Sequence, residues 1–127
     1  MRYMYFVQAA PDGAPPPPRL MEEIAKMGEQ AVKDGKMVTT GGLMPISQAV
    51  RVRLKGGKLS VTDGPFAESK EVVGGFAIFE LASREEAIQG AIDFMEVHRL
   101  YGGDWEGVCE LREMVDTPPG VPGCGQA

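Results

Sequence analysis

The sequence predicts an α+β domain with two helices packed on one face of an antiparallel sheet. Two segments with helical spacing are separated by several strand-like segments, and a further strand-like segment stands at each end. The chain has 127 residues, of which 43% are hydrophobic and 24% are charged, as in a globular protein with one core. The order strand, helix, several strands, helix, strand is that of a ferredoxin-like domain.

The first predicted strand is Tyr3–Val7, whose aromatic and branched residues do not alternate with polar ones. This pattern favours a central strand that is covered on both faces. Pro11-Asp12-Gly13-Ala14 and the four prolines Pro15–Pro18 follow. Because proline lacks an amide donor and prefers extended backbone, we expect a stiff loop that leads into a helix. A proline-rich ligand for a signalling domain is the alternative interpretation.

The first predicted helix spans Arg19–Lys33 and ends at Asp34-Gly35. Its apolar and small residues form one stripe, which we expect to be buried. The members of this stripe are Leu20, Met21, Ile24, Ala25, Gly28, Ala31 and Val32. An extended segment then starts at Met37 and ends at Gly41-Gly42.

The next segment alternates with period two, with apolar residues at 50, 52 and 54 and basic residues between them. Gly56-Gly57 predicts a tight turn, and residues 58–62 form the returning strand of a hairpin. A further strand is predicted over Val72–Leu81. Its apolar residues stand at both odd and even positions, which face opposite sides of a sheet, so we expect this strand to be covered on both sides.

Ser83 and Glu86 predict a capping box at the start of the second helix. One stripe of this helix carries Ala87, Ala91, Phe94, Met95 and His98. Gly102-Gly103 ends the region, and Val108–Val115 is the last predicted strand. Residues from Thr117 onward are mostly proline and glycine, so we expect one domain over residues 1–116 and a flexible tail over 117–127.

Composition also restricts the partners. The net charge of −5 repels phosphate backbones and anionic membranes, so we expect neither nucleic-acid nor membrane binding. A sheet with both helices on one face leaves its other face uncovered, and in a short chain a second copy is the simplest cover, so we expect a twofold homodimer. Cys109 and Cys124 form no disulfide framework, and the apolar run Tyr3–Ala10 resembles neither a spanning helix nor a signal peptide. We therefore expect a cytoplasmic protein.

The turn Asp63-Gly64-Pro65-Phe66 is the most informative segment of the chain. Pro65 fixes its own φ and biases Gly64 toward an extended conformation, so Asp63 can hold its carboxylate at a fixed point. A carboxylate in that position suits an acid, a base or a hydrogen-bond acceptor. The alternative is an Asx-type turn in which Asp63 only caps backbone N–H groups.

The run from Asp63 to Glu71, followed by Gly74-Gly75-Phe76, closely resembles the signature of the YCII-related proteins, specifically their DGPF branch. Four other segments are similar to this family: Met1–Met4, Val50–Arg53, Phe94–His98 and Trp105–Arg112. The similarity covers roughly residues 1–115, apart from the proline loop.

The resemblance implies a dimeric α/β-barrel of ferredoxin-like protomers with a pocket near the Asp-Gly-Pro turn. In YCII-like relatives a histidine–aspartate pair has been proposed as catalytic, and the aspartate matches Asp63. The histidine expected on or near the first helix has no counterpart, because His98 is the single histidine of this chain. The link of DGPF proteins with alternative sigma factors implies a regulatory role.

Other residues are candidates for the site. His98, near the end of the second helix, is a candidate proton donor. The alternative is that its ring only forms hydrogen bonds with carbonyl groups at the end of the helix. It can pair with Asp63 only if the two meet within the chain or across a dimer. Arg51, Arg53 and Lys70 are candidates to bind an anionic small molecule, although alternating charges also occur on a solvated face.

The candidate ligand-binding set also includes Gly64, Pro65, Phe66 and Trp105. Trp105 is a candidate pocket wall or stacking surface, with a core or interface position as the alternative. One histidine and two separated cysteines make no metal site, and no cofactor is expected.

Three functions fit the sequence: a cofactor-independent acid/base enzyme, a non-catalytic binding or regulatory module, and a domain whose turn is purely architectural. The enzyme requires an accessible Asp63 close to a second polar group. The architectural alternative requires its carboxylate to bond backbone N–H groups. A regulatory module requires an exposed apolar patch outside the dimer interface.

Overall fold

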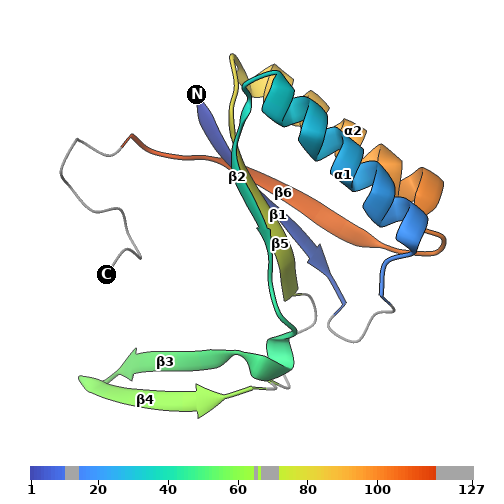
Figure 1. The fold of residues 1–127 in the computed structure, drawn as a ribbon. Helices are drawn as coiled ribbons and strands as arrows, with labels where there is room; N and C mark the ends of the chain where they lie inside the picture. The colour runs from blue at the N-terminus through green and yellow to red at the C-terminus, as the bar shows by residue number, and fades with distance from the viewer. Residues whose placement is uncertain (11–14, 65, 67–71, 117–127) are drawn as a thin grey trace.

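A computed structural model describes residues 1–10, 15–64, 66 and 72–116 of the chain. Its elements in chain order are β1 Arg2–Ala9, α1 Pro18–Lys33, β2 Met37–Gly42, the 3-10 turn η1 Ile46–Gln48, β3 Val50–Lys55, β4 Lys58–Asp63, β5 Val72–Glu80, α2 Arg84–Tyr101 and β6 Gly107–Glu113 (Figure 1). These bounds confirm the predicted order of strands and helices.

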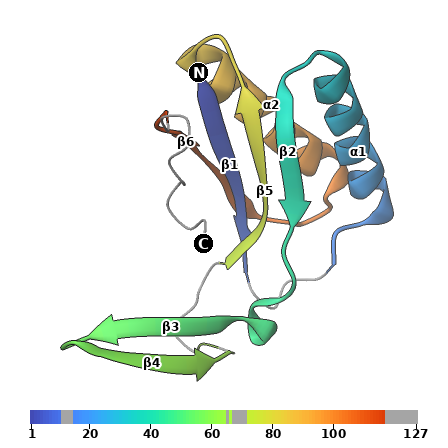
Figure 2. The same ribbon diagram turned by 60° about the vertical axis from the view of Figure 1, so that its left-hand side comes forward.

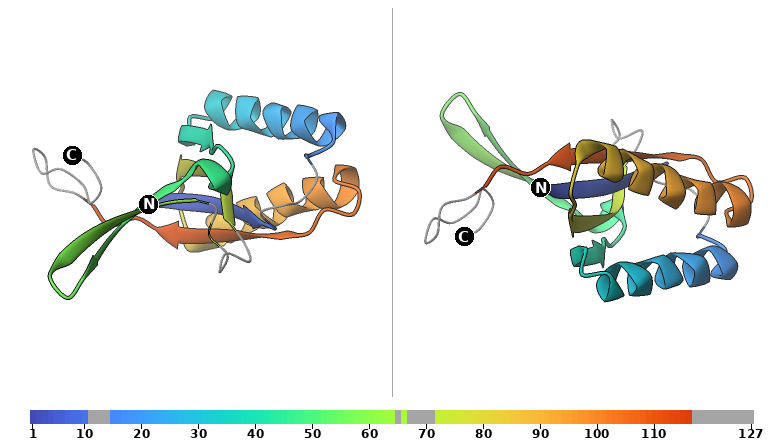
Figure 3. Two further views of the ribbon diagram at one scale, coloured as in Figure 1. Left: turned by 90° about the horizontal axis from the view of Figure 1, so that it is seen from below. Right: turned by 90° about the horizontal axis from the view of Figure 1, so that it is seen from above.

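The main sheet has four strands in the order β2-β5-β1-β6, and every neighbouring pair is antiparallel. The helices α1 and α2 run side by side along the sheet (Figures 1 and 3). This is the predicted α+β, ferredoxin-like arrangement. It also confirms that β1 is a central strand, because β5 pairs with one of its edges and β6 with the other.

The β3–β4 hairpin forms a separate sheet of two strands. Gly56 and Gly57 connect its strands with φ values of 59° and 76°, which a type I′ turn requires and which glycine adopts without strain. The hairpin projects away from the helices (Figures 1 and 2). The sequence predicted both strands of this hairpin. It did not predict that they form a separate sheet, because a period-two pattern does not show whether a hairpin joins the main sheet.

The core lies between α2 and the sheet. It consists of five buried residues, Tyr3, Tyr5, Leu81, Ala87 and Ala91, with Phe79, Cys109 and Leu111 packed against them. Burial raises the pKa of the Cys109 thiol. The hydroxyl of Tyr5 donates a 2.5 Å hydrogen bond to the carbonyl oxygen of Ala87. A Cβ at position 90 would lie 3.1 Å from that hydroxyl, so Gly90 lets the tyrosine approach the helix closely.

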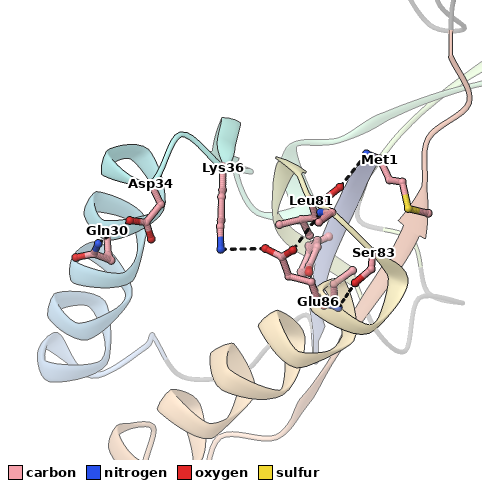
Figure 4. A network of polar contacts seen from close by, with 10 residues as sticks. Met1, Gln30, Asp34, Lys36, Leu81, Ser83 and Glu86 are labelled. Atoms are coloured by element: carbon pink, nitrogen blue, oxygen red, sulfur yellow. Dashed lines mark hydrogen bonds and ion pairs between the residues drawn. The ribbon is translucent and has the colours of Figure 1, made fainter.

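A network of polar contacts fixes the start of α2 (Figure 4). The Ser83 hydroxyl oxygen accepts from the amide of Glu86, which confirms Ser83 as the N-cap. The Glu86 carboxylate reaches back to the amide of Ala82, one residue earlier than in the usual capping box. Its other oxygen pairs with the Lys36 ammonium at 2.9 Å, which ties α2 to the segment just before β2.

The prediction that the α1 stripe is buried was wrong for most of its length. Leu20 is buried, but Met21 is 50% exposed and Val32 is 62% exposed. The reason is that α1 stands off the sheet instead of packing closely on it, so its apolar residues border a cavity. Within the described residues, no helix combines the length and apolarity needed to cross a bilayer.

Candidate functional site

Asp63 is the last residue of β4 and pairs in register with Val50. Its side chain is exposed, and within the described residues it has no hydrogen bond or ion pair. The backbone here is satisfied without it, since the amide of Gly64 donates to the carbonyl of Ala49 at 2.8 Å. The architectural alternative requires the Asp63 carboxylate to bond backbone N–H groups, and within the described residues it bonds none.

Gly64 and Phe66 build the base of the hairpin. A Cβ at position 64 would lie 2.5 Å from the carbonyl oxygen of Ile46, so a glycine is needed where η1 passes the turn. Phe66 is 9% exposed, and the guanidinium carbon of Arg51 lies 3.7 Å from the centre of its ring. This cation–π contact joins two of the predicted ligand-binding residues to each other.

The remaining basic candidates are not gathered around this contact. Arg53 is exposed and pairs in register with Ser60 on β4. Pro65 and Lys70, which the sequence also placed in the site, lie outside the described residues.

His98 is the buried polar side chain of the described core, with 6% of its surface exposed. Its Nδ1 lies 2.9 Å from the carbonyl oxygen of Phe94. Because a carbonyl can only accept, Nδ1 carries the proton, and Nε2 of the neutral ring is an acceptor. The ring packs between Phe94 and Trp105, with centroid distances of 4.6 Å and 4.5 Å.

The Nε2 atom of His98 is not fully buried. No contact is recorded for it within the described residues, where every fully buried side-chain nitrogen or oxygen has a hydrogen-bond partner. Nε2 is therefore not sealed in the core, and His98 lines the cavity described next. The predicted alternative, in which helix carbonyls satisfy the ring, accounts for Nδ1 alone.

A cavity of about 1730 Å³ lies between α1, α2 and the sheet; we call it the α1 cavity. Representative residues of its wall come from every layer: Leu20 and Ile24 of α1, Phe79 of β5, Phe94 and His98 of α2, and Trp105 before β6. Its volume exceeds that of ordinary ligand pockets, which reach about 1000 Å³.

Two of the charged groups that line the α1 cavity form an ion pair with each other. Lys36 pairs with Glu86, and the hydrogen bond from Lys36 holds the pKa of the Glu86 carboxyl below its usual value. The amide of Gln89 donates to Asp93 at 2.8 Å. Most of the other lining residues are apolar, although Glu29, Lys33, Asp104 and Glu106 also line the cavity, and no contact of His98 Nε2 is recorded within the described residues.

The structure thus divides the predicted site residues into two groups. His98 and Trp105 line the α1 cavity, whereas Asp63, Arg51 and Phe66 lie at the base of the hairpin and are not among its described lining residues. Asp63 and His98 make no contact within this chain. Within the described residues, no group of three or more histidine, cysteine, aspartate or glutamate side chains is suited to hold a metal ion.

Sequence analysis missed the cavity residues of α1 and β5, such as Leu20, Ile24 and Phe79. Leu20 and Ile24 were assigned to an ordinary core stripe. The small residues Ala25 and Gly28 in that stripe were the available signal, because they leave space where a core helix would carry larger side chains.

Two comparisons relate this chain to known proteins. A family model described as the YCII-related domain matches residues 1–97. The chain is also 36% identical over 102 residues to an uncharacterised protein of Rhizobium meliloti (strain 1021), covering 80% of this chain and 78% of that protein. Strand β6 lies beyond the matched residues and still pairs with β1, so the sheet extends past the match. The chain belongs to the family of YCII-related domains.

Proposed function

We propose that this YCII-related domain binds a small, planar and largely apolar molecule in the α1 cavity. One observation carries the proposal: an apolar cavity meets a single buried histidine whose Nε2 has no recorded partner. Pockets for small molecules have this composition, with mostly apolar walls and a few polar groups that orient the ligand.

The chemistry of the wall defines the ligand class. Phe79, Phe94 and Trp105 offer aromatic surfaces, which favour a flat ring system. Two lysines and five acidic residues line the cavity, and this net charge of −3 disfavours an anionic ligand; the residues are Lys33, Lys36, Glu29, Glu86, Asp93, Asp104 and Glu106. Nε2 of His98 accepts a hydrogen bond, so the ligand carries one hydroxyl or N–H donor.

The test uses 1-naphthol, which has a flat apolar body and one donor, and measures its dissociation constant by equilibrium dialysis. Gly28→Leu adds a side chain on the cavity wall, where the nearest atom to a new Cβ is Met37 Cε at 4.0 Å. Glu22→Leu adds the same side chain on the outer side of α1 and is the control. We expect binding to weaken at least tenfold in Gly28→Leu and to stay within twofold in Glu22→Leu.

Two results contradict this proposal. One is a failure of the unmodified protein to bind 1-naphthol at all. The other is an equal loss of affinity in the two leucine variants, which would place the ligand elsewhere. Circular dichroism melting of both variants shows whether either loss comes from unfolding.

A catalytic role of Asp63 is a second candidate function. It is supported by an exposed carboxylate at a strand end that has no partner within the described residues. Asp63 would act as an acid or a base at the hairpin base, whereas Arg53 pairs with Ser60 further along the hairpin and projects from its other face. Asp63→Asn tests this role: turnover should be lost while the melting temperature stays the same. A lower melting temperature with no effect on ligand retention would instead indicate an architectural role.

The motif Asp63-Gly64-Pro65-Phe66 also supports placing the chain in the DGPF branch. A regulatory function linked to sigma-factor-dependent transcription is then the alternative to catalysis. The observation in its favour is the exposed apolar surface of the β3–β4 hairpin, since a surface of that kind marks an interaction site.

A further inference from the structure

The helices α1 and α2 run antiparallel, so the start of one lies beside the end of the other (Figure 3). At one end of the pair, the guanidinium carbon of Arg19 on α1 lies 4.9 Å from the centre of the Tyr101 ring on α2. At the opposite end, Lys36 just after α1 pairs with Glu86 in the first turn of α2. The α1 cavity lies along both helices, so its two ends are lined by different residues.

The end of the cavity beside the end of α2 is acidic. It is lined by His98 and residues 102–106, and we call these residues the indole end. Asp104 and Glu106 stand on either side of Trp105 in the sequence, and both are exposed. The indole end therefore reaches solvent and carries two carboxylates but no lysine or arginine.

Both lysines among the described lining residues lie toward the opposite end. Lys36 pairs with Glu86 at 2.9 Å. Lys33 is in the last turn of α1 and stands four residues after Glu29, on the same side of the helix. These two lysines and two glutamates balance each other in charge. The surplus negative charge of the cavity wall therefore comes from Asp93 and the two carboxylates of the indole end.

The arginines near the indole end are paired with other carboxylates. Arg19 lies over the ring of Tyr101 and pairs with Glu23 at 3.1 Å, and Arg99 pairs with Glu96. Neither arginine is among the described residues that line the cavity. The start of α1 and the end of α2 carry opposite partial charges, which offset each other in an antiparallel pair. The carboxylate side chains therefore set the sign of the charge at this end.

The buried histidine is a second and independent reason to expect a charged donor here. His98 is 6% exposed, and its Nδ1–H donates to the carbonyl oxygen of Phe94 at 2.9 Å. Nε2 of this tautomer accepts a hydrogen bond and has no recorded contact within the described residues. An ammonium group can donate to it, whereas a carboxylate or phosphate group without a proton cannot. The indole of Trp105, which packs on His98, also attracts cations through its ring face.

The rest of the wall fits an apolar body. Leu20, Ile24 and Phe79 line the cavity away from the carboxylates. An inorganic cation would leave these side chains facing water. Within the part of the chain that the structure describes, no cluster of three or more histidine, cysteine or acidic side chains could hold a metal ion. These properties together indicate an organic cation with an aromatic ring and one charged donor.

We propose that the α1 cavity binds an arylalkylammonium ion, with its ring on the apolar wall and its ammonium group at the indole end. This inference rests on the function proposed above and names the ligand class of the same site. The ammonium group donates to Nε2 of His98, and the carboxylates of Asp104 and Glu106 attract it. Because these carboxylates are exposed, salt screens the attraction.

The test compares three compounds that share one naphthalene ring and differ in charge. They are 1-naphthylmethylamine as the cation, 1-naphthalenemethanol as the neutral compound and 1-naphthoate as the anion. Equilibrium dialysis at about pH 7.5 gives each dissociation constant. We expect the amine to bind at least tenfold more tightly than the alcohol, and the naphthoate at least tenfold more weakly. Raising KCl from about 20 mM to about 500 mM should reduce the advantage of the amine.

A pair of variants locates the charge that makes this selection. Asp104→Asn with Glu106→Gln removes the two carboxylates of the indole end and keeps side chains of similar shape. Glu110→Gln with Glu113→Gln removes the same charge from exposed positions on β6 that do not line the cavity, and is the control. The preference for the amine over the alcohol should fall at least fivefold in the first variant and stay within twofold in the control. The alcohol should bind all three proteins within twofold.

Two results overturn the inference: equal binding of the amine and the alcohol by the unmodified protein, or an equal preference for the amine in both double variants. The first result leaves the apolar ligand site standing without a charge preference. Failure of both 1-naphthol and 1-naphthalenemethanol to bind contradicts instead the function proposed for the cavity. If the Asp104 and Glu106 variant melts below the working temperature, the three compounds and the salt series on the unmodified protein decide the question.

Discussion

The imidazole of His98 lies against the indole of Trp105, with their ring centroids 4.5 Å apart. They are the single histidine and the single tryptophan of the chain. His98 comes from α2 and Trp105 from the loop before β6, and both line the α1 cavity. Each ring therefore gives one spectroscopic signal that reports directly on the proposed ligand site.

The first prediction concerns the acceptor atom of His98. His98→Phe keeps a ring between Phe94 and Trp105 but removes Nε2, so the affinity for 1-naphthol should fall about tenfold, or about 1.4 kcal/mol. Binding of 1-methoxynaphthalene, which has no donor, should stay within twofold. Equilibrium dialysis with both compounds measures the difference, and an equal loss for the two would show that His98 acts only through packing.

The position of Trp105 depends on Gly107. A Cβ at position 107 would collide with Cη2 of Trp105 and would lie 2.5 Å from the carbonyl oxygen of Gln8. Gly107→Ala should therefore move the indole away from His98, shift its fluorescence emission and weaken 1-naphthol binding. Gly42→Ala is the control for the emission spectrum alone, since no atom lies within 4 Å of its new Cβ but Gly42 itself lines the α1 cavity. Identical emission spectra for the two variants would contradict the prediction.

Tyr5 makes stability depend on pH in the alkaline range. Burial, with smaller contributions from Cys109 and Glu86, raises the pKa of Tyr5 to about 12. Since the pKa is higher in the folded state than in the unfolded state, this contribution is complete below about pH 10 and is lost as the pH rises toward 12. Urea unfolding between pH 8 and pH 11.5 should show this loss for the unmodified protein.

Tyr5→Phe is the variant that isolates this effect. It removes the hydrogen bond to the carbonyl of Ala87 and should lower the free energy of unfolding by about 1 kcal/mol at pH 7. Between pH 10 and pH 11.5 its stability should fall less than that of the unmodified protein. Parallel curves for the two proteins would mean that Tyr5 is not the titrating group.

The N-cap of α2 is expected to contribute measurably to stability. Ser83→Ala removes the acceptor of the Glu86 amide, and the free energy of unfolding should fall by about 1 kcal/mol. Ser83→Asn, which keeps a side-chain acceptor, should lose much less. Urea denaturation of the three proteins provides the comparison, and an alanine variant as stable as the asparagine variant would contradict the assigned cap.

The helices and strands could be predicted from local sequence patterns, whereas the distance between α1 and the sheet could not. The apolar stripe beginning at Leu20 correctly predicted a helix, and Gly56-Gly57 correctly predicted a hairpin turn. A stripe shows which side of a helix is apolar, but not how closely that side approaches the sheet. For this reason the exposure of Met21 and Val32 could not be predicted from periodicity.

Sequence analysis proposed individual site residues but not the contacts between them, because these contacts depend on how separate segments of the chain come together. His98 and Trp105 were each proposed separately, but their contact depends on the chain reversal at Gly102-Gly103 and on the space at Gly107. The contact of Arg51 with Phe66 likewise joins β3 to a residue beyond β4. Neither pair is close enough in sequence for spacing alone to reveal it.

The most direct test of the α1 cavity is a titration of the ¹⁵N-labelled protein with 1-naphthol, observed by NMR. The account predicts that the Nε2 signal of His98 and the indole N–H signal of Trp105 both shift, with a single common dissociation constant. The amide of Glu22, on the outer side of α1, should not move. Saturable binding of 1-naphthol that leaves both ring signals unchanged would contradict the assignment of this cavity as the ligand site.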